Sequence, residues 1–325
     1  MSNPLQALLF LPRIRVQNAN AISSPLTWGF PAPSAFLGFA HALNLRVREK
    51  MNLNLNGVGI ICHAFEPQVH SVAGKRTKVF ALTRNPLNKN GESPPIVEEG
   101  RAHLEITLIM GAEGESLWDG TDLSDLACAI GEVANAMRLA GGSILPGRGG
   151  AEATPYLVKL PEDVQGMADE SRKFRRKLLP GFALVERPDI LQERVRLLKD
   201  GTANATALDA LLEFSTLNFA PERTEAAEGE KVLWRIQPKS GWLVPVPVGY
   251  AAISDIYAPG TVANTRAPDV PFRFVESLLG LGQWISPHRI ADLRSLLWYH
   301  DAQPAHGLYR CHNNYSQFLT QRQGI

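Results

Sequence analysis

The 325-residue sequence lacks the patterns typical of membrane, secreted and disulfide-stabilised proteins. No apolar run approaches the ~18–20 residues of a membrane span, and no basic segment precedes the apolar start of the chain, as it would in a signal peptide. The three cysteines (Cys62, Cys128 and Cys311) lie far apart and form no CxxC pair, which argues against a zinc ribbon and a disulfide framework. We therefore expect a protein of the reducing cytoplasm.

Patterns for catalysis are missing too. The eight histidines are scattered without an HxxxH or HExxH spacing, and no paired-carboxylate pattern occurs, so we expect neither a metal nor a cofactor. His41, near the apolar stripe of a predicted helix, and His63, in a predicted strand, could each serve as a general base. Histidines in such positions are more often hydrogen-bonded core residues, and we expect the protein not to be an enzyme.

Acidic residues are scarce in the first third of the chain. Residues 1–91 contain ten lysines and arginines but only Glu49 and Glu66 as acids, a balance of +8, whereas the net charge of the whole chain is +1. One strongly basic segment in a nearly neutral protein is typical of a surface that binds a polyanion. Chance clustering on a solvated surface is the alternative.

The periodicity of the first 150 residues predicts an α+β fold with a ferredoxin-like core. We expect strands at residues 7–16, 58–65, 102–110 and 143–146 and helices at residues 34–50 and 121–139. The order β-α-β-β-α-β is that of the ferredoxin-like fold, which also underlies RNA-recognition (RRM-like) modules.

Single residues refine these elements. Ser34 is the expected N-cap of the first helix, and Pro12 indicates a bulge or a sheet edge in the first strand. In the same strand, Ile14 and Val16 would face the core, whereas Arg13, Arg15 and Gln17 would form a basic face on the other side.

A basic insertion separates the two central strands. Residues 67–100 are far longer than the usual connection and are rich in turn formers, which predicts a projecting hairpin with a strand at 79–83 and a turn near 85–91. Its cations would hold a phosphate backbone, as a flexible arm; the alternative is that they merely keep the loop soluble. These cations are Lys75, Arg76, Lys78 and Arg84.

Two loops carry groups suited to nucleic acid. Residues 138–150 (RLAGGSILPGRGG) place five glycines beside Arg138 and Arg148, so that backbone N–H groups and guanidinium groups can approach a phosphate; a helix C-cap at Gly141 with ordinary turns is the alternative. The segment lacks the Gly-Lys-Ser/Thr ending of a P-loop. Residues 17–31 place amides and hydroxyls beside Trp28, which would stack on a base; the alternative is a polar turn with its tryptophan in the core.

The second half, residues 151–325, is expected to be a mixed helical and strand-rich region. Predicted helices cover residues 169–179, 188–200, 206–217, 272–284 and 288–300, an exposed acidic loop covers 220–231, and strands occur within 232–253. The basic run RKFRRK at residues 172–177 would be either a second contact with an anion or a solvated helix face.

Several long motifs resemble one family, the Csy-two family. It is the Cas-five-type, RAMP-superfamily subunit of the type I-F CRISPR surveillance (Csy, or Cascade) complex. The resemblance covers nearly the whole chain, from residue 7 to 310. The matching motifs are QNANAISSPLTWGFP, AGKRTKVFALTRNPLN, VEEGRAHLEITL, MRLAGGSILPG, LLPGFALVERP, GWLVPVPVGY, FVESLLGLGQWISPHR and LWYH.

The resemblance implies a non-catalytic, RNA-binding subunit in antiviral defence. It implies that the subunit holds the five-prime handle of the CRISPR RNA, pairs with the large subunit and contacts the nearest backbone subunit. It also implies that residues 138–150 are the family's glycine-rich loop and that residues 74–100 are its thumb-like hairpin. We accordingly expect an RNA-binding core at residues 1–150, with its arm at about 67–100, and a region for subunit contacts at 151–325.

The expected RNA contacts combine the strand face, the polar loop, the arm and the glycine loop. They are Arg13, Arg15, Gln17, Asn18, Asn20, Ser23, Trp28, Lys75, Arg76, Lys78, Arg84, Arg138, Gly141, Gly142 and Arg148. The rival hypothesis is a RAMP-type endoribonuclease that processes repeat RNA with His41 or His63 as general base, because relatives on this fold do cleave RNA.

Overall fold

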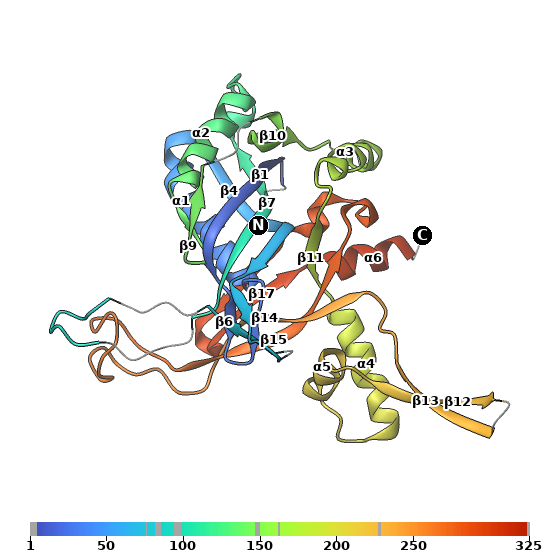
Figure 1. Cartoon of the computed structure of the whole chain (residues 1–325). Helices are drawn as coiled ribbons and strands as arrows, with labels where there is room; N and C mark the ends of the chain where they lie inside the picture. The colour runs from blue at the N-terminus through green and yellow to red at the C-terminus, as the bar shows by residue number, and fades with distance from the viewer. Residues whose placement is uncertain are drawn as a thin grey trace.

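A computed structural model describes residues 5–75, 77–81, 86–93, 99–146, 150–161, 163–226 and 229–323. Within these residues the protein is a mixed α/β structure built on one antiparallel sheet of eleven strands (Figure 1). The strands are β1 (Ala7–Asn20), β4 (Leu53–Pro67), β7 (Arg101–Gly114), β8 (Arg138–Leu139), β9 (Gly142–Leu145), β10 (Tyr156–Lys159), β11 (Phe182–Glu186), β14 (Trp242–Ala252), β15 (Val275–Ile285), β16 (Trp298–Gln303) and β17 (Leu308–Asn313). None of the described helices is long and apolar enough to cross a membrane.

The first half follows the predicted element order. Along the chain come β1, α1 (Pro33–Met51), β4, β7, α2 (Leu123–Asn135) and β9, and in the sheet the four strands lie in the order β4-β7-β1-β9 with antiparallel neighbours. The register between β1 and β7 shifts between Leu11 and Ile14, which confirms the bulge expected at Pro12. Arg13, the residue after Pro12, takes a positive φ of 53° there.

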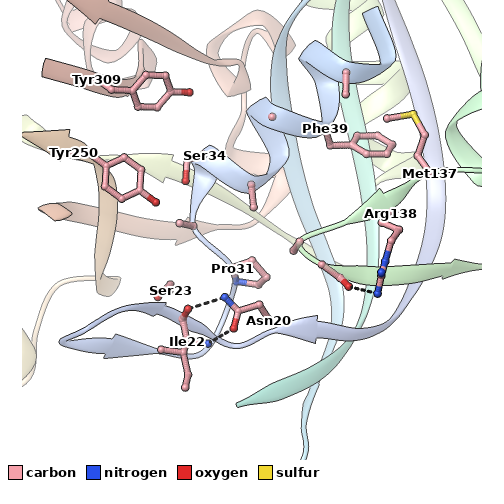
Figure 2. Close-up of a pocket in the computed structure, with 16 residues that line it drawn as sticks. Asn20, Ile22, Ser23, Pro31, Ser34, Phe39, Met137, Arg138, Tyr250 and Tyr309 are labelled. Atoms are coloured by element: carbon pink, nitrogen blue, oxygen red, sulfur yellow. Dashed lines mark hydrogen bonds between the residues drawn. The ribbon is translucent and has the colours of Figure 1, made fainter. Parts of the chain in front are cut away.

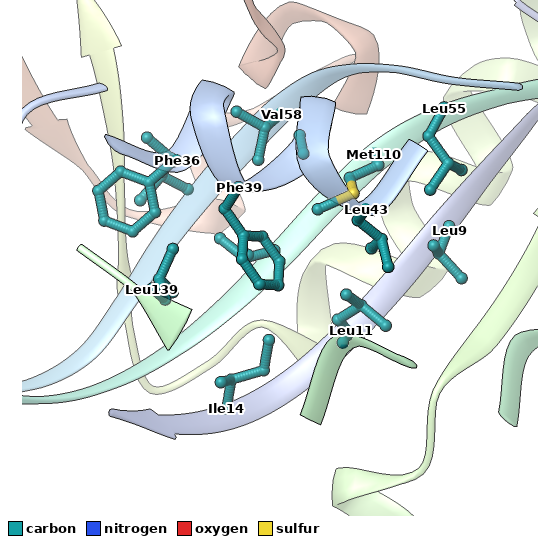
Figure 3. Close-up of a cluster of buried hydrophobic side chains, with 14 of the residues drawn as sticks. Leu9, Leu11, Ile14, Phe36, Phe39, Leu43, Leu55, Val58, Met110 and Leu139 are labelled. Atoms are coloured by element: carbon teal, nitrogen blue, oxygen red, sulfur yellow. The ribbon is translucent and has the colours of Figure 1, made fainter. Parts of the chain in front are cut away.

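Both faces of this sheet are covered. On one face, the apolar stripe of α1 (Phe36, Ala40, Leu43 and Val47) is buried in a core that also holds Leu9 and Leu11 of β1 (Figure 3). On the other face, Leu8 and Phe10 pack with residues of α3 (Val164–Lys177). This double burial explains why β1 begins with a continuous apolar run instead of an alternating one.

The ends of both helices differ from the prediction. The N-cap of α1 is Ala32, without a side-chain cap, and Pro33 takes the first helical position, so the prediction of Ser34 as N-cap was wrong. Helix α2 ends at Asn135, before the predicted residue 139, and Asp122 caps its start by accepting hydrogen bonds from two backbone N–H groups. The residues that follow α2 form β8 and β9 instead, because they pair with each other and with β1.

The insertion contains a short hairpin, as expected. Strands β5 (Val69–Ser71) and β6 (Lys78–Phe80) pair antiparallel outside the main sheet. The predicted strand at 79–83 therefore starts one residue earlier, and its residues 82–83 lie outside the described part of the chain. In Figure 1 the described parts of the insertion, drawn in cyan, lie away from the sheet.

The second half confirms three predicted helices and corrects three predictions. Helices α3, α4 (Pro188–Gly201) and α5 (Ala207–Ser215) are present, and α6 (Tyr315–Gln323) follows β17. The expected acidic loop at 220–231 is instead a hairpin of β12 (Phe219–Ala226) and β13 (Gly229–Ile236). The predicted helix at 272–284 is β15, and the one at 288–300 is two short 3₁₀ turns, Pro287–Arg289 and Leu293–Leu296, followed by β16.

The error at β15 has a physical cause. The strand lies between β11 and β14 and is buried around Leu281, so its sequence VESLLGLGQWI does not alternate between apolar and polar residues. A continuous apolar run does not distinguish a central strand from a buried helix. Strands from both sides of residue 150 share the sheet, since β4 pairs with β11 and β16.

Candidate nucleic-acid interface

A groove opens at the N-terminal end of α1 and has a volume of about 680 Å³. We call it the α1 groove (Figure 2). Its walls come from the end of β1, the short strand β2 (Ile22–Ser24), which pairs with β3 (Thr27–Trp28), the start of α1, the turn between β8 and β9, and the strands β14 and β17. Four of the expected RNA contacts meet here: Asn20, Ser23, Arg138 and Gly141.

The glycine turn forms one wall of the groove. Ala140 and Gly141 both have positive φ angles, 49° and 75°, and Gly141 would meet nothing within 4 Å if it carried a Cβ. The Asn20 N–H donates to the carbonyl of Ala140 at 2.8 Å, which ties this turn to the end of β1. Because α2 ends at Asn135, Gly141 does not cap that helix, and the C-cap alternative was wrong.

Arg138 is an exposed cation at this wall. One of its terminal nitrogens donates to the carbonyl of Gly141 at 2.8 Å, and no ion pair to Arg138 occurs within the described residues. A guanidinium has five N–H donors, so most of its donors remain available for an anion. The neighbouring N-terminus of α1 carries no acidic residue in its first turn, which leaves its partial positive charge unopposed.

Gly142, unlike Gly141, lies too close to a neighbouring strand to accommodate a side chain. A Cβ on Gly142 would lie 2.6 Å from the Gln17 carbonyl oxygen and 2.8 Å from both the Ala19 nitrogen and Val16 Cγ1. These atoms belong to β1, so Gly142 is needed where β9 packs against that strand, and it is buried.

The polar loop uses its own side chains to form turns. The Asn20 side chain donates to the Ile22 carbonyl at 2.8 Å and accepts from the Ile22 N–H at 3.1 Å. The Ser23 hydroxyl lies 2.9 Å from the Thr27 hydroxyl. These are the Asx and Ser turns of the alternative interpretation, yet they form the lower edge of the groove in Figure 2. Asn18, with φ of 58°, accepts a hydrogen bond from the Gln68 side chain at 2.6 Å.

The basic strand face is partly neutralised by residues from other strands. Arg13 donates to Glu105 Oε1 at 3.0 Å and to the Leu179 carbonyl at 3.2 Å, so its charge serves an internal ion pair. Arg15 lies opposite Glu105 in the register of β1 and β7. Arg15 and Gln17 line a smaller cavity that also holds Glu66. Sequence periodicity placed these cations on one face but could not place the acids beside them.

Two cationic side chains of the arm are exposed to solvent. Lys75 and Lys78 are exposed, and no ion pair to either occurs within the described residues. Arg76 and Arg84, and Arg148 of the glycine loop, lie outside the described residues. Trp28 is 57% exposed and contacts Phe80 of the arm edge-to-face at 5.5 Å; it lines a separate apolar cavity with Trp242 and Trp284 rather than the α1 groove.

The basic run of α3 has structural partners. Arg172 pairs with Asp169 at 2.8 Å and Lys173 with Glu170 at 3.6 Å, each three residues apart on the helix. The Arg175 guanidinium donates to the Ile290 carbonyl at 3.1 Å, and the Lys177 ammonium lies 4.7 Å from the centre of the Tyr156 ring. These contacts favour the helix-face interpretation of the run over an anion site.

Neither candidate general base is placed for catalysis in this groove. His63 Nδ1 lies 2.6 Å from the Pro180 carbonyl and therefore donates to it, which leaves Nε2, 2.7 Å from the Thr107 hydroxyl, as an acceptor. Burial lowers the pKa of His63, so the neutral form is favoured. His41 is exposed on α1, outside its apolar stripe. No group of three or more metal-binding side chains occurs in the described part of the chain.

Two tyrosines were missed by the sequence analysis. Tyr250 of β14 and Tyr309 of β17 line the α1 groove opposite the glycine turn. Burial raises the pKa of Tyr309 to about 12, so its hydroxyl stays protonated at neutral pH. No spacing in the sequence connects these residues with Arg138; only the order of strands in the sheet brings them together.

Comparison with known proteins agrees with the resemblance. A family model described as CRISPR-associated protein (Cas_Csy2) matches residues 9–311. The chain is also 52% identical over 310 residues to CRISPR-associated protein Csy2 of Pseudomonas aeruginosa (strain UCBPP-PA14), and the match covers 94% of each chain. With a family model matching most of its length and a relative of this identity, the chain belongs to the Csy2 family of CRISPR-associated proteins.

Proposed function

We propose that this chain is a non-catalytic RNA-binding subunit of a type I-F CRISPR surveillance complex, where it holds the five-prime handle of the CRISPR RNA. Its membership of the Csy2 family supports a role in such a complex. The observation that carries RNA binding is the α1 groove, where an arginine with no ion pair among the described residues, an open glycine turn and polar side chains from distant segments meet. Its place of action is then the cytoplasm.

The strand order supports a RAMP-type core. Numbered along the chain, the four strands β1, β4, β7 and β9 lie in the sheet in the order 4-1-3-2, which we interpret as a ferredoxin-like unit. The α1 groove lies beside the unit's fourth strand and first helix. In this proposal the handle backbone runs past Arg138 and Gly141, and the exposed Lys75 and Lys78 of the arm hold it from outside.

The second half would supply the contacts to other subunits, the large subunit and the nearest backbone subunit. Its β12–β13 hairpin exposes Phe219, Trp234 and Ile236, which are 53%, 66% and 53% exposed and point to one side of the ribbon, because Phe219 pairs with Ile236 and Pro221 with Trp234. A two-stranded ribbon with a bare apolar face is marginally stable in water. Exposed aromatic surface of this kind is typical of protein interfaces.

The rival endoribonuclease hypothesis finds less support. A general base needs a free lone pair within hydrogen-bond reach of the substrate. Both ring nitrogens of His63 are occupied by the Pro180 carbonyl and the Thr107 hydroxyl, and His63 lines the apolar cavity rather than the α1 groove.

The test is to purify the chain from cells that contain the repeat RNA and to ask what accompanies it. We expect a discrete small RNA and a larger protein subunit. Arg138→Ala should weaken binding of that RNA, whereas the matched control Arg172→Ala, which removes an arginine already paired with Asp169, should leave it unchanged. Absence of any RNA, or metal-independent cleavage of repeat RNA that His63→Gln abolishes, would contradict the proposal.

A further inference from the structure

The α1 groove has an aromatic wall that the phosphate contacts do not explain. Tyr250 and Tyr309 are directly opposite each other in the pairing of β14 and β17, so their side chains leave the same face of the sheet, and their ring centres are 6.4 Å apart. Figure 2 shows both rings directed toward the side of the groove formed by α1. Tyr250 is 39% exposed.

The helix wall is shaped to leave this space open. Gly38 is exposed in the second turn of α1, and a Cβ there would meet nothing within 4 Å. Glycine is a poor helix former, so its presence at this position is unfavourable for the helix itself. Ser34 lies one turn earlier on the same face and lines the groove, and its hydroxyl makes no hydrogen bond to another described residue.

The two ends of the groove differ in chemistry. The glycine turn and Arg138 offer N–H donors and positive charge, while the opposite wall offers uncharged rings and a serine hydroxyl. The linings of the groove contain no aspartate or glutamate among the described residues. A ligand that binds to both ends of the groove would carry a phosphate for the glycine turn and Arg138, and a flat, hydrogen-bonding ring for the tyrosine wall.

We propose that the α1 groove holds one unstacked base of single-stranded RNA against Tyr250, with the phosphate of that nucleotide at Arg138. The proposal rests on the RNA-binding function above and names the part of the RNA that this site takes. The volume of about 680 Å³ lies within the range of small-ligand sites, ~300–1,000 Å³, and admits a nucleotide. The Tyr309 ring lies beside the Tyr250 ring and supports it.

The test is an abasic scan of the RNA that co-purifies with the full-length chain. That RNA is resynthesised with one base removed at a time and titrated against wild type and Tyr250→Ala. We expect one position whose base removal weakens wild-type binding about tenfold, in line with base–aromatic stacking, and that has little further effect in Tyr250→Ala. Trp118→Ala, which removes a 61% exposed aromatic outside the groove, is the matched control and should behave as wild type.

A second variant fills the space without removing a contact. Gly38→Met adds a good helix former where there is room, so it should fold, and it should bind intact RNA more weakly while no longer distinguishing it from the RNA that lacks the critical base.

The outcomes separate the two proposals. If wild type binds no RNA, the proposed function fails and this inference with it. If wild type binds RNA but no single base removal has an effect that Tyr250→Ala and Gly38→Met abolish, the inference alone is overturned. If RNA binding survives both variants and only capture of the larger subunit is lost, the groove takes a protein side chain instead, which also overturns it.

Discussion

Two adjacent glycines allow stability and RNA binding to be separated. A Cβ on Gly142 would lie under 3.0 Å from the Gln17 carbonyl oxygen, the Ala19 nitrogen and Val16 Cγ1, whereas a Cβ on Gly141 would meet nothing within 4 Å. The first two atoms are backbone of β1, which pairs with β9 through Gln17 and Ser143 and cannot move without disturbing that pairing. Gly142→Ala should therefore mainly lower the stability of the fold, and Gly141→Ala should mainly lower the affinity for RNA.

The expected magnitudes follow from these contacts. Gly142→Ala should lower the free energy of unfolding by about 3 kcal/mol, near the upper end of what overpacking typically costs. Gly141→Ala should lower it by about 1 kcal/mol, because only its φ of 75° disfavours a side chain. A domain of ordinary stability, about 5–15 kcal/mol, remains folded in both cases.

The assay is urea denaturation followed by circular dichroism, combined with titration of the co-purifying RNA under conditions in which each variant is folded. Gly142→Ala should show the larger loss of stability and Gly141→Ala the larger loss of RNA affinity relative to its stability. Gly141→Asn is the control for backbone strain, since asparagine tolerates a positive φ but adds a side chain to the groove. If Gly142→Ala is as stable as wild type, the close approach of β9 to β1 is not as inferred; if Gly141→Asn binds RNA like wild type, Gly141 does not face the RNA.

Three further predictions concern charge. Lys75→Ala and Lys78→Ala should each reduce the slope of log affinity against log salt by about 1, and a slope unchanged in the double variant would remove the arm from the RNA interface. Burial lowers the pKa of His63 below its ordinary 6.5, so on acidification the unfolded chain binds the proton at a higher pH than the folded protein does. The free energy of unfolding should therefore fall as the pH drops below about 6.5. The urea midpoint of His63→Gln should depend less on pH than that of wild type. Arg13→Met should cost about 1–2 kcal/mol in urea denaturation by leaving Glu105 without its half-buried partner, and a neutral effect would show that the pair adds nothing.

Local patterns predicted the elements, or parts of elements, in which buried and less buried residues alternate regularly. The alternation of Leu104 and Ile106 with less buried neighbours identified the first part of β7, and the apolar stripe from Phe36 to Val47 identified α1, because these residues repeat with the period of a strand and of a helix. The pattern failed at β15, which is buried within the sheet. It also failed at β12–β13, where charged residues suggested a loop but the backbone forms a paired ribbon.

For the candidate site, the sequence by itself determined which residues could contact RNA: a basic first third, a glycine-rich segment beside an arginine, and a polar segment with a tryptophan. Only the tertiary structure decided which of them meet. Asn20 and Arg138 line one groove, together with Tyr250 from the other half of the chain, whereas Arg13 donates to Glu105. The physical reason is that periodicity reports how one element is buried, whereas neighbours across a sheet depend on strand order and register, which are set by packing over the whole chain.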